Sequence, residues 1–107
     1  MQRNLKAGPI FAALGDGVRL RIVARLSDEG PMSITALTAG TKITRQAVSK
    51  HLDILRRAGL VRSHWRGREN LWRLEQRRLE EARRYLLAIS EQWDQALARL
   101  RDYVEKS

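Results

Sequence analysis

The apolar residues near the start of the chain share one face of a predicted helix. Ile10, Phe11 and Leu14 are spaced so that their side chains fall on the same side of such a helix. Gly8 and Pro9 precede them, and proline suits the first helical position because its fixed φ and missing N–H cost nothing there. We therefore expect the first helix to begin at Gly8-Pro9.

Two further helices are predicted between residues 16 and 40. Asp16 can accept hydrogen bonds from the first backbone N–H groups of the second helix, which Gly30-Pro31 ends. Its apolar residues recur at helical spacing: Val18, Ile22, Val23 and Leu26. Ser33 can cap a short third helix, which ends at Gly40.

A fourth helix follows after a three-residue turn, which makes a helix-turn-helix. Thr44 is its expected N-cap, and the helix is predicted from Arg45 to about Ala58. Its inner face is apolar: Ala47, Val48, Leu52 and Leu55. Gly59 supplies a left-handed residue after the helix, and Leu60 can close onto the last inner leucine in a Schellman ending.

After Leu60 the spacing of apolar residues changes from a helical to an extended pattern. Strands are predicted from Leu60 to about Trp65 and from Leu71 to Leu74, with residues 66–70 as the turn between them. A long last helix is predicted over residues 79–104, a length of about 39 Å. A near-heptad apolar stripe follows it: Leu79, Ala82, Leu86, Ile89, Trp93, Leu97, Leu100 and Val104.

The expected fold class is mainly α with a small β-hairpin between the fourth and fifth helices, a winged helix-turn-helix. The 107 residues suit one domain over residues 1–107. The absence of cysteine excludes disulfides, thiolate metal sites and thiol redox sensing. No segment approaches the roughly 20 apolar residues that cross a bilayer, so we expect a cytoplasmic protein without membrane contact.

The net charge of +9 is concentrated in the middle of the chain. Residues 45–78 hold 10 basic and 3 acidic side chains, whereas residues 79–107 hold 5 basic and 6 acidic ones. A positive excess suggests a polyanionic partner, either nucleic acid or an anionic membrane. A membrane is disfavoured because the long amphipathic helix lies in the slightly acidic last segment.

The predicted fourth helix carries the residue types that read duplex DNA. In a helix-turn-helix the second helix enters the major groove near its N-terminus. Arg45 can bind guanine and Gln46 can bind adenine through paired hydrogen bonds. Ser49 suits a base or a phosphate, whereas Lys50 suits a phosphate. The helix N–H groups beside the Thr44 cap also attract phosphate. The alternative, a merely solvated polar face, is disfavoured by the turn and the local charge.

The tip of the predicted hairpin is a second candidate DNA contact. Gly67 permits the backbone to reverse, and Arg66 and Arg68 then project from the tip. Two arginines at a wing tip can enter a minor groove or bind phosphate. Taken alone these residues would indicate a solvated turn, so the interpretation as a DNA contact depends on the helix-turn-helix upstream.

The long last helix predicts a homodimer. Its apolar stripe is longer than a domain of this size can cover, and pairing across a two-fold axis buries such a face. The expected interface residues come from the first and last helices: Ile10, Phe11, Leu86, Ile89, Trp93, Leu97 and Leu100. The alternative is a core helix packed only within its own chain. A dimer places two recognition helices one DNA turn apart, which predicts an inverted-repeat operator.

Taken together, these residues resemble the ArsR-type winged helix-turn-helix repressors. The resemblance is strongest from Gln46 through Leu55 and from Ala58 through Val61, and it extends over roughly residues 9–104. It implies five helices with a hairpin before the last, a dimer, operator binding and repression, often relieved by an inducer. It also implies that His51, in the recognition helix, contacts the DNA backbone or serves as a half-buried structural histidine.

The sequence departs from the metal-sensing members of that family. Ser33 and Thr35 stand where such sensors often carry a cysteine pair, and the last helix has no histidine. Its carboxylates alone make poor transition-metal sites. His51 and His64 have no obvious co-ligand. We therefore expect no metal and no cofactor, and the sequence does not identify an effector.

Two further function classes, besides membrane binding, compete with an operator-binding regulator. An enzyme is disfavoured because no nucleophile–base pair, metal-ligand cluster or phosphate-binding glycine loop is visible. A winged-helix module that binds RNA or protein without operator specificity stays open as the alternative.

Four aromatic residues could line a small apolar pocket for an effector, although aromatics at such positions more often belong to a core or an interface: Trp65, Trp72, Tyr85 and Trp93.

Overall fold

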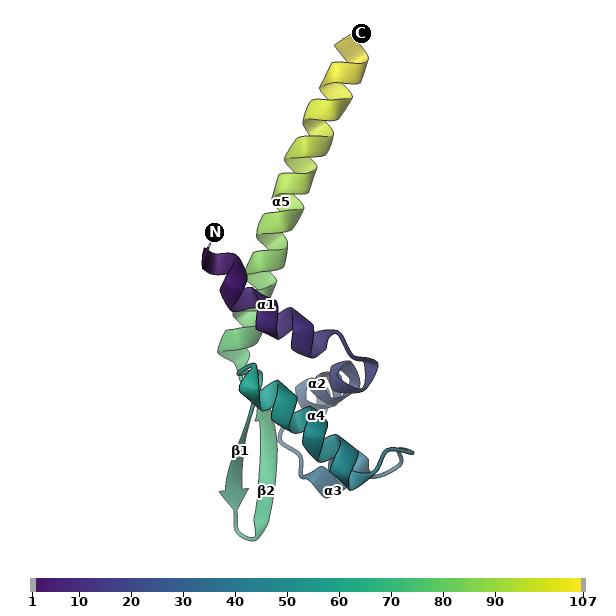
Figure 1. The fold of residues 1–107 in the computed structure, drawn as a ribbon, viewed down its shortest axis with the longest axis vertical. Coiled ribbons are helices and arrows are strands. Elements are labelled where there is room, and N and C mark those ends of the chain that lie inside the picture. The colour runs from purple at the N-terminus through teal and green to yellow at the C-terminus, as the bar shows by residue number, and fades with distance from the viewer. Residues whose placement is uncertain (1, 107) are drawn as a thin grey trace.

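The computed structural model describes residues 2–106, with side chains from residue 8 onward. Met1 and Ser107, the ends of the expected domain, lie outside the described residues. The chain forms α1 (Gln2–Leu14), α2 (Gly17–Glu29), α3 (Ile34–Thr38), α4 (Arg45–Arg57), β1 (Val61–Arg66), β2 (Glu69–Leu74) and α5 (Gln76–Lys106). Figure 1 shows α5 extending away from the other elements, in a molecule that measures 68 × 29 × 20 Å.

The predicted helix caps are confirmed. The Asp16 side chain accepts hydrogen bonds from the backbone N–H groups of Val18 and Arg19, at 2.8 and 3.1 Å, so it satisfies two donors at the start of α2. Ser33 caps α3, and Thr44 caps α4. Each of these short polar side chains ends the preceding turn and fixes the residue at which the next helix begins.

The end of α4 is the predicted Schellman motif. Gly59 has a φ of +79°, which a residue without a side chain adopts readily. The Leu60 N–H donates to the Leu55 carbonyl and the Gly59 N–H to the Arg56 carbonyl, both at 2.9 Å. Val61 then begins β1, so only residues 58–60 separate α4 from the hairpin.

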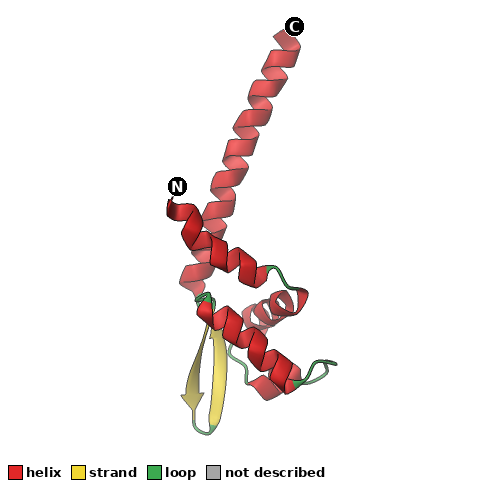
Figure 2. Ribbon diagram, viewed as in Figure 1, coloured by secondary structure: helices red, strands yellow, loops and turns green. Residues whose placement is uncertain are grey.

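The hairpin is longer than expected, because its turn is shorter. The strands pair antiparallel from Val61 opposite Leu74 to Arg66 opposite Glu69, which leaves only Gly67 and Arg68 in the turn. Gly67 has a φ of +64°, as the first position of a type II′ turn requires. The predicted turn over residues 66–70 is therefore wrong: the tight turn lets Glu69 and Asn70 join β2 (Figure 2).

The predicted start of α1 is also wrong. The helix begins at Gln2, and Pro9 lies inside it rather than at its first position. The residues before Gly8 are mostly good helix formers, and a helix tolerates one missing N–H when neighbouring packing supports it. That packing comes from Ile10, which is 1% exposed.

The core lies where α2, α4 and the hairpin meet. Buried apolar residues from all of these elements form one cluster: Ile22, Leu26, Val48, Leu52, Leu55, Leu60, Val61, Trp72 and Leu74. Met32, between α2 and α3, exchanges two backbone hydrogen bonds with Trp72, at 2.9 and 2.8 Å. This bridge attaches the base of β2 to the helix-turn-helix.

Among the described side chains, those in the first part of α5 pack on the rest of the chain. Ala82 is buried, and the Phe11 ring of α1 lies 5.6 Å from the Tyr85 ring. Beyond this contact α5 projects past α1 (Figure 1). None of the described helices is long and apolar enough to cross a membrane.

Candidate nucleic-acid interface

The two faces of α4 have opposite chemistry. Val48, Leu52 and Leu55 are buried in the core and fix the rotation of the helix about its axis. The opposite face is exposed and polar in its first two turns: Arg45, Gln46, Ser49 and Lys50. The structure thus presents outward the four side chains that the sequence analysis selected as base and phosphate contacts.

Thr44 caps α4 through its hydroxyl oxygen, which leaves the hydroxyl hydrogen available as a donor. Its hydroxyl oxygen accepts a hydrogen bond from the Ala47 N–H at 3.1 Å. The hydroxyl hydrogen can still be donated to a phosphate oxygen. The N–H groups of the first turn point in the same direction, which favours an anion at this end of α4.

Positive charge is compensated at one end of α4 and not at the other. Near its C-terminus, Asp53 binds Arg56 at 2.6 Å and Arg57 at 2.9 Å, and the hydrogen bond from Arg56 lowers the pKa of the Asp53 carboxyl. Near its N-terminus, no carboxylate of the described residues pairs with Arg45 or Lys50. The field at the exposed N-terminal face is therefore positive.

The hairpin tip adds a second positive surface. Arg66 and Arg68 are exposed, and within the described part of the chain neither forms an ion pair. Figure 1 shows the tip at the same end of the molecule as α3 and the start of α4, opposite the free end of α5. The recognition helix and the wing are thus both available to one extended partner.

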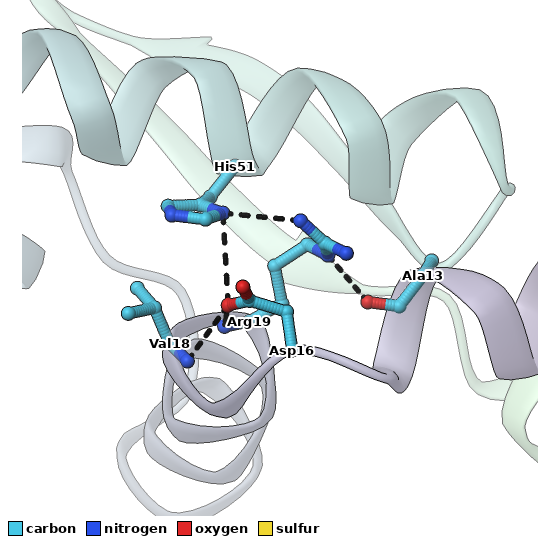
Figure 3. A network of polar contacts seen from close by, with 5 residues as sticks. All are labelled: Ala13, Asp16, Val18, Arg19 and His51. Atoms are coloured by element: carbon cyan, nitrogen blue, oxygen red, sulfur yellow. Dashed lines mark hydrogen bonds and ion pairs between the residues drawn. The ribbon is translucent and has the colours of Figure 1, made fainter.

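The His51 ring contacts residues at the start of α2, as Figure 3 shows. The Arg19 guanidinium lies 3.3 Å from His51 Nδ1, and an Asp16 carboxylate oxygen lies 3.9 Å from the same atom. When Arg19 donates to Nδ1, the neutral tautomer of the ring carries its proton on Nε2. Arg19 is anchored in turn by donating to the Ala13 carbonyl oxygen. The His51 side chain is 21% exposed, so it has a structural role and a small outward surface.

Asp16 is the charged end of this network. The backbone N–H of Arg19 lowers the pKa of the Asp16 carboxyl, with smaller contributions from Val18, the Arg19 guanidinium and His51. Sequence reasoning identified Asp16 as a cap but missed its link to His51. The two residues are 35 positions apart, and only the packing of α2 on α4 brings them together.

The other candidate sites do not assemble in one place. Among the described residues no group of three or more metal-ligating side chains is close enough to hold an ion. The aromatic residues are dispersed: Trp72 is buried in the core, Trp65 is exposed on the hairpin, and Trp93 is exposed on α5. They do not line a common pocket.

Known proteins share this architecture. A family described as a helix-turn-helix domain matches residues 14–64. An uncharacterised HTH-type transcriptional regulator of Methanocaldococcus jannaschii is 33% identical over 81 residues, which are 76% of this chain and 91% of that protein. An ArsR-like transcriptional regulator from Rhodococcus sp. RHA1 has a TM-score of 0.82 at 32% identity, with 95% of each chain covered.

The chain belongs to the ArsR-type family of helix-turn-helix transcriptional regulators. This assignment confirms the expected family and the winged fold, and it confirms a regulator rather than an enzyme, because the matched relatives are transcriptional regulators. A more distant ArsR-type neighbour from Mycobacterium bovis, at 24% identity and a TM-score of 0.60 over 90% of this chain and 82% of that one, has the same fold. That protein is described as a homodimeric winged helix-turn-helix DNA-binding domain.

Proposed function

We propose that this ArsR-type regulator binds an inverted-repeat operator as a homodimer and represses transcription. The observation that carries the proposal is the exposed, unpaired basic face at the N-terminal half of α4, with the wing tip at the same end of the molecule. Phosphate attraction supplies affinity, and side chains on this face supply base selection. A chromosomal partner agrees with the cytoplasmic location predicted from the sequence.

Each exposed residue of α4 has a distinct proposed role. Arg45 binds guanine O6 and N7, and Gln46 binds adenine N6 and N7, because these pairings use two hydrogen bonds each. Ser49 and Lys50 bind base edges or phosphates on either side. Thr44 donates its hydroxyl hydrogen to a phosphate at the helix N-terminus.

The remaining proposed contacts come from the wing and from His51. Arg66 and Arg68 bind backbone phosphates or enter the adjacent minor groove. His51 offers the Nε2–H that its contact with Arg19 leaves free, which suits a phosphate oxygen. These contacts raise affinity more than sequence selectivity.

The proposed homodimer is supported by the apolar face of α5. Its exposed fractions are high in residues that normally avoid water: Leu86 54%, Trp93 62%, Leu97 57%, Leu100 58% and Val104 62%. The exposed stripe continues over the half of α5 that lies beyond α1, and a second α5 has the matching shape and chemistry to cover it. The Mycobacterium bovis neighbour is described as a homodimer.

One predicted interface residue has to be removed from this proposal. Ile10 is 1% exposed within a single chain, so it packs in its own core and has no surface left for a partner. Phe11 and Ile89 stay in the proposed interface, because both are only partly buried.

The proposal is tested by selecting random duplex DNA with the full-length protein. We expect an inverted repeat whose half-sites lie about one helical turn apart, bound more tightly than random duplex and more weakly as salt rises. Transcription in vitro from a promoter that contains the selected site should then fall when the protein is added. Equal binding to random duplex and to structured RNA would favour the alternative, a module without operator specificity.

A further inference from the structure

A basic pocket lies away from the proposed DNA-binding face. It has a volume of about 800 Å³, and it forms where the end of α4, the start of β1 and the first two turns of α5 meet. Four arginines from these three elements line it: Arg57, Arg62, Arg77 and Arg78. Its volume is within the range of small-molecule sites, roughly 300–1,000 Å³.

The carboxylates around the pocket neutralise it only in part. Glu75 binds Arg62 at 2.9 Å, Glu81 binds Arg78 at 3.1 Å, and Asp53, outside the lining, binds Arg57 at 2.9 Å. Arg77 has no ion pair with any described residue. The charge of Arg77 is therefore left uncompensated in the pocket wall, which suits an anion.

Arg78 packs beside the glycine that follows α4. A Cβ atom on Gly59 would lie 2.9 Å from Arg78 Nε and 3.3 Å from its Cγ, so a side chain there would displace the Arg78 side chain. The glycine after α4 therefore serves the helix ending and also leaves space for this arginine.

The first turn of α5 carries positive charge, whereas the N-terminus of a helix normally favours negative charge. This turn contains Arg77 and Arg78 and no acidic residue. Of the two, only Arg77 lacks a carboxylate partner among the described residues. A bound anion would offset its unfavourable position at the helix N-terminus.

We propose that this pocket binds a small anion with at least two negative charges, of the phosphate-ester or polycarboxylate class. Guanidinium groups bind the oxygens of either class through paired, charge-assisted hydrogen bonds. The lining is mostly polar, with Pro9, Ala58 and Gly59 as its apolar part, so an uncharged apolar ligand does not fit.

The place of the pocket makes such an anion an effector of DNA binding. It contacts the end of the recognition helix through Arg57, the base of the wing through Arg62, and the dimerisation helix through Arg77. An anion that binds the free protein more tightly than the DNA-bound protein shifts the equilibrium away from DNA. This regulatory part rests on the proposed function, whereas anion binding itself does not.

The binding test uses the full-length protein with pyrophosphate and citrate as probes, titrated calorimetrically at constant ionic strength. We expect at least one probe to bind, and the stronger one identifies the class. Arg77→Gln should weaken that binding about ten-fold, because one charge-assisted contact is lost. Arg77 has no ion pair in the described chain, so its loss should leave the thermal unfolding temperature unchanged.

Arg99→Gln is the matched control, because it removes the same charge from an exposed position of α5 outside the pocket. It should bind the probe as the wild type does. Absence of binding by both probes, or equal weakening in Arg77→Gln and Arg99→Gln, would overturn the proposed site.

The regulatory test uses the selected duplex with and without the bound probe. We expect the anion to weaken binding of the wild type about five-fold and to leave Arg77→Gln unaffected. An unchanged DNA affinity at saturating anion would overturn the effector role while leaving the pocket as a binding site. If no duplex were selected, the proposed function would fail, and the calorimetric result would still decide the anion site.

Discussion

The helices α4 and α5 have the same pattern of apolar residues, but they differ in how far those residues are buried. Both carry a stripe of large apolar residues at helical spacing. In α4 the stripe disappears into the core, where Leu52 and Leu55 are 0% exposed, whereas Trp93 and Tyr103 on α5 are 62% and 75% exposed. The difference lies in the neighbours: α2, α3 and β1 pack against α4, while the outer half of α5 passes beyond α1.

A different face of each helix is left for a partner. In α4 the apolar face holds the fold together, so the polar face is the one available to DNA. In the outer half of α5 large apolar side chains such as Trp93 and Leu97 stay exposed, and burying each of them is worth about 1.5–3 kcal/mol only when another chain covers it.

Truncation in α4 should damage the fold. Leu52→Ala should lower the free energy of unfolding by about 2–5 kcal/mol, because it leaves a cavity among fully buried neighbours. Urea unfolding measures the loss. Leu97→Ala is the control: at a protein concentration where the chain is monomeric it should change stability little, since Leu97 is 57% exposed. Equal losses in both variants would contradict the comparison.

A charge in the stripe of α5 should break the dimer and spare the fold. Trp93→Glu should sediment as a monomer with an unchanged circular dichroism spectrum, because the carboxylate cannot be buried against the partner helix. Gln95→Glu adds the same charge on the opposite side of α5 and should remain dimeric. A normal Trp93→Glu dimer would show that the interface lies elsewhere.

Removal of a base contact should cost binding without costing stability. Arg45→Ala should weaken operator binding by about 1–3 kcal/mol and relax base preference at one position of each half-site. Arg56→Ala, on the compensated end of the same helix, should change neither. Competition between the selected duplex and single-base variants measures both quantities.

Loss of an arginine side chain at the wing tip should weaken binding to all DNA sequences alike. Arg68→Ala should weaken binding to all duplexes by a similar factor and reduce the slope of log affinity against log salt concentration by about 1, because one phosphate contact is lost. A change in base preference with an unchanged slope would instead indicate base reading by the wing.

The smallest expected effect concerns Asp16. Its pKa is lowered in the folded chain, chiefly by the hydrogen bond from the Arg19 N–H, so its stabilising contribution is present above the ordinary value of 3.8 and is lost as the pH falls through the lower, folded-state pKa. The stability difference between the wild type and Asp16→Ala should therefore narrow as pH is lowered from 7 to 3. A difference that stays constant over this interval would show that the carboxylate charge is not involved.

Local signals in the sequence were sufficient for most of the fold. The caps at Asp16, Ser33 and Thr44 and the ending at Gly59 depend on hydrogen bonds within a few residues, so residue type alone predicts them. The outward set on α4 was predictable for a similar reason, because the buried face of a single helix determines the exposed one.

The sequence predictions fail, or miss a contact, where segments that are far apart in the sequence pack together. Pro9 marks a helix start by local preference, but it lies inside α1. Ile10 packs in the core and is therefore unavailable to the dimer. The contact of Arg19 with His51 depends on the packing of α2 on α4, and the basic pocket depends on three elements meeting. Sequence spacing carries no signal for such contacts.

Only residues 58–60 separate α4 from β1. Leu60 is hydrogen-bonded to Leu55 and is fully buried, as is Val61, which ties the base of the hairpin to the end of α4. We therefore expect the proposed base contacts of α4 and the proposed phosphate contacts of the wing to keep one spacing within each half-site. If related operators differ in length, the variation must lie between the half-sites, where the two long helices of a dimer set the spacing. An extra residue inserted after Val61 would move the wing relative to bases that α4 still reads correctly.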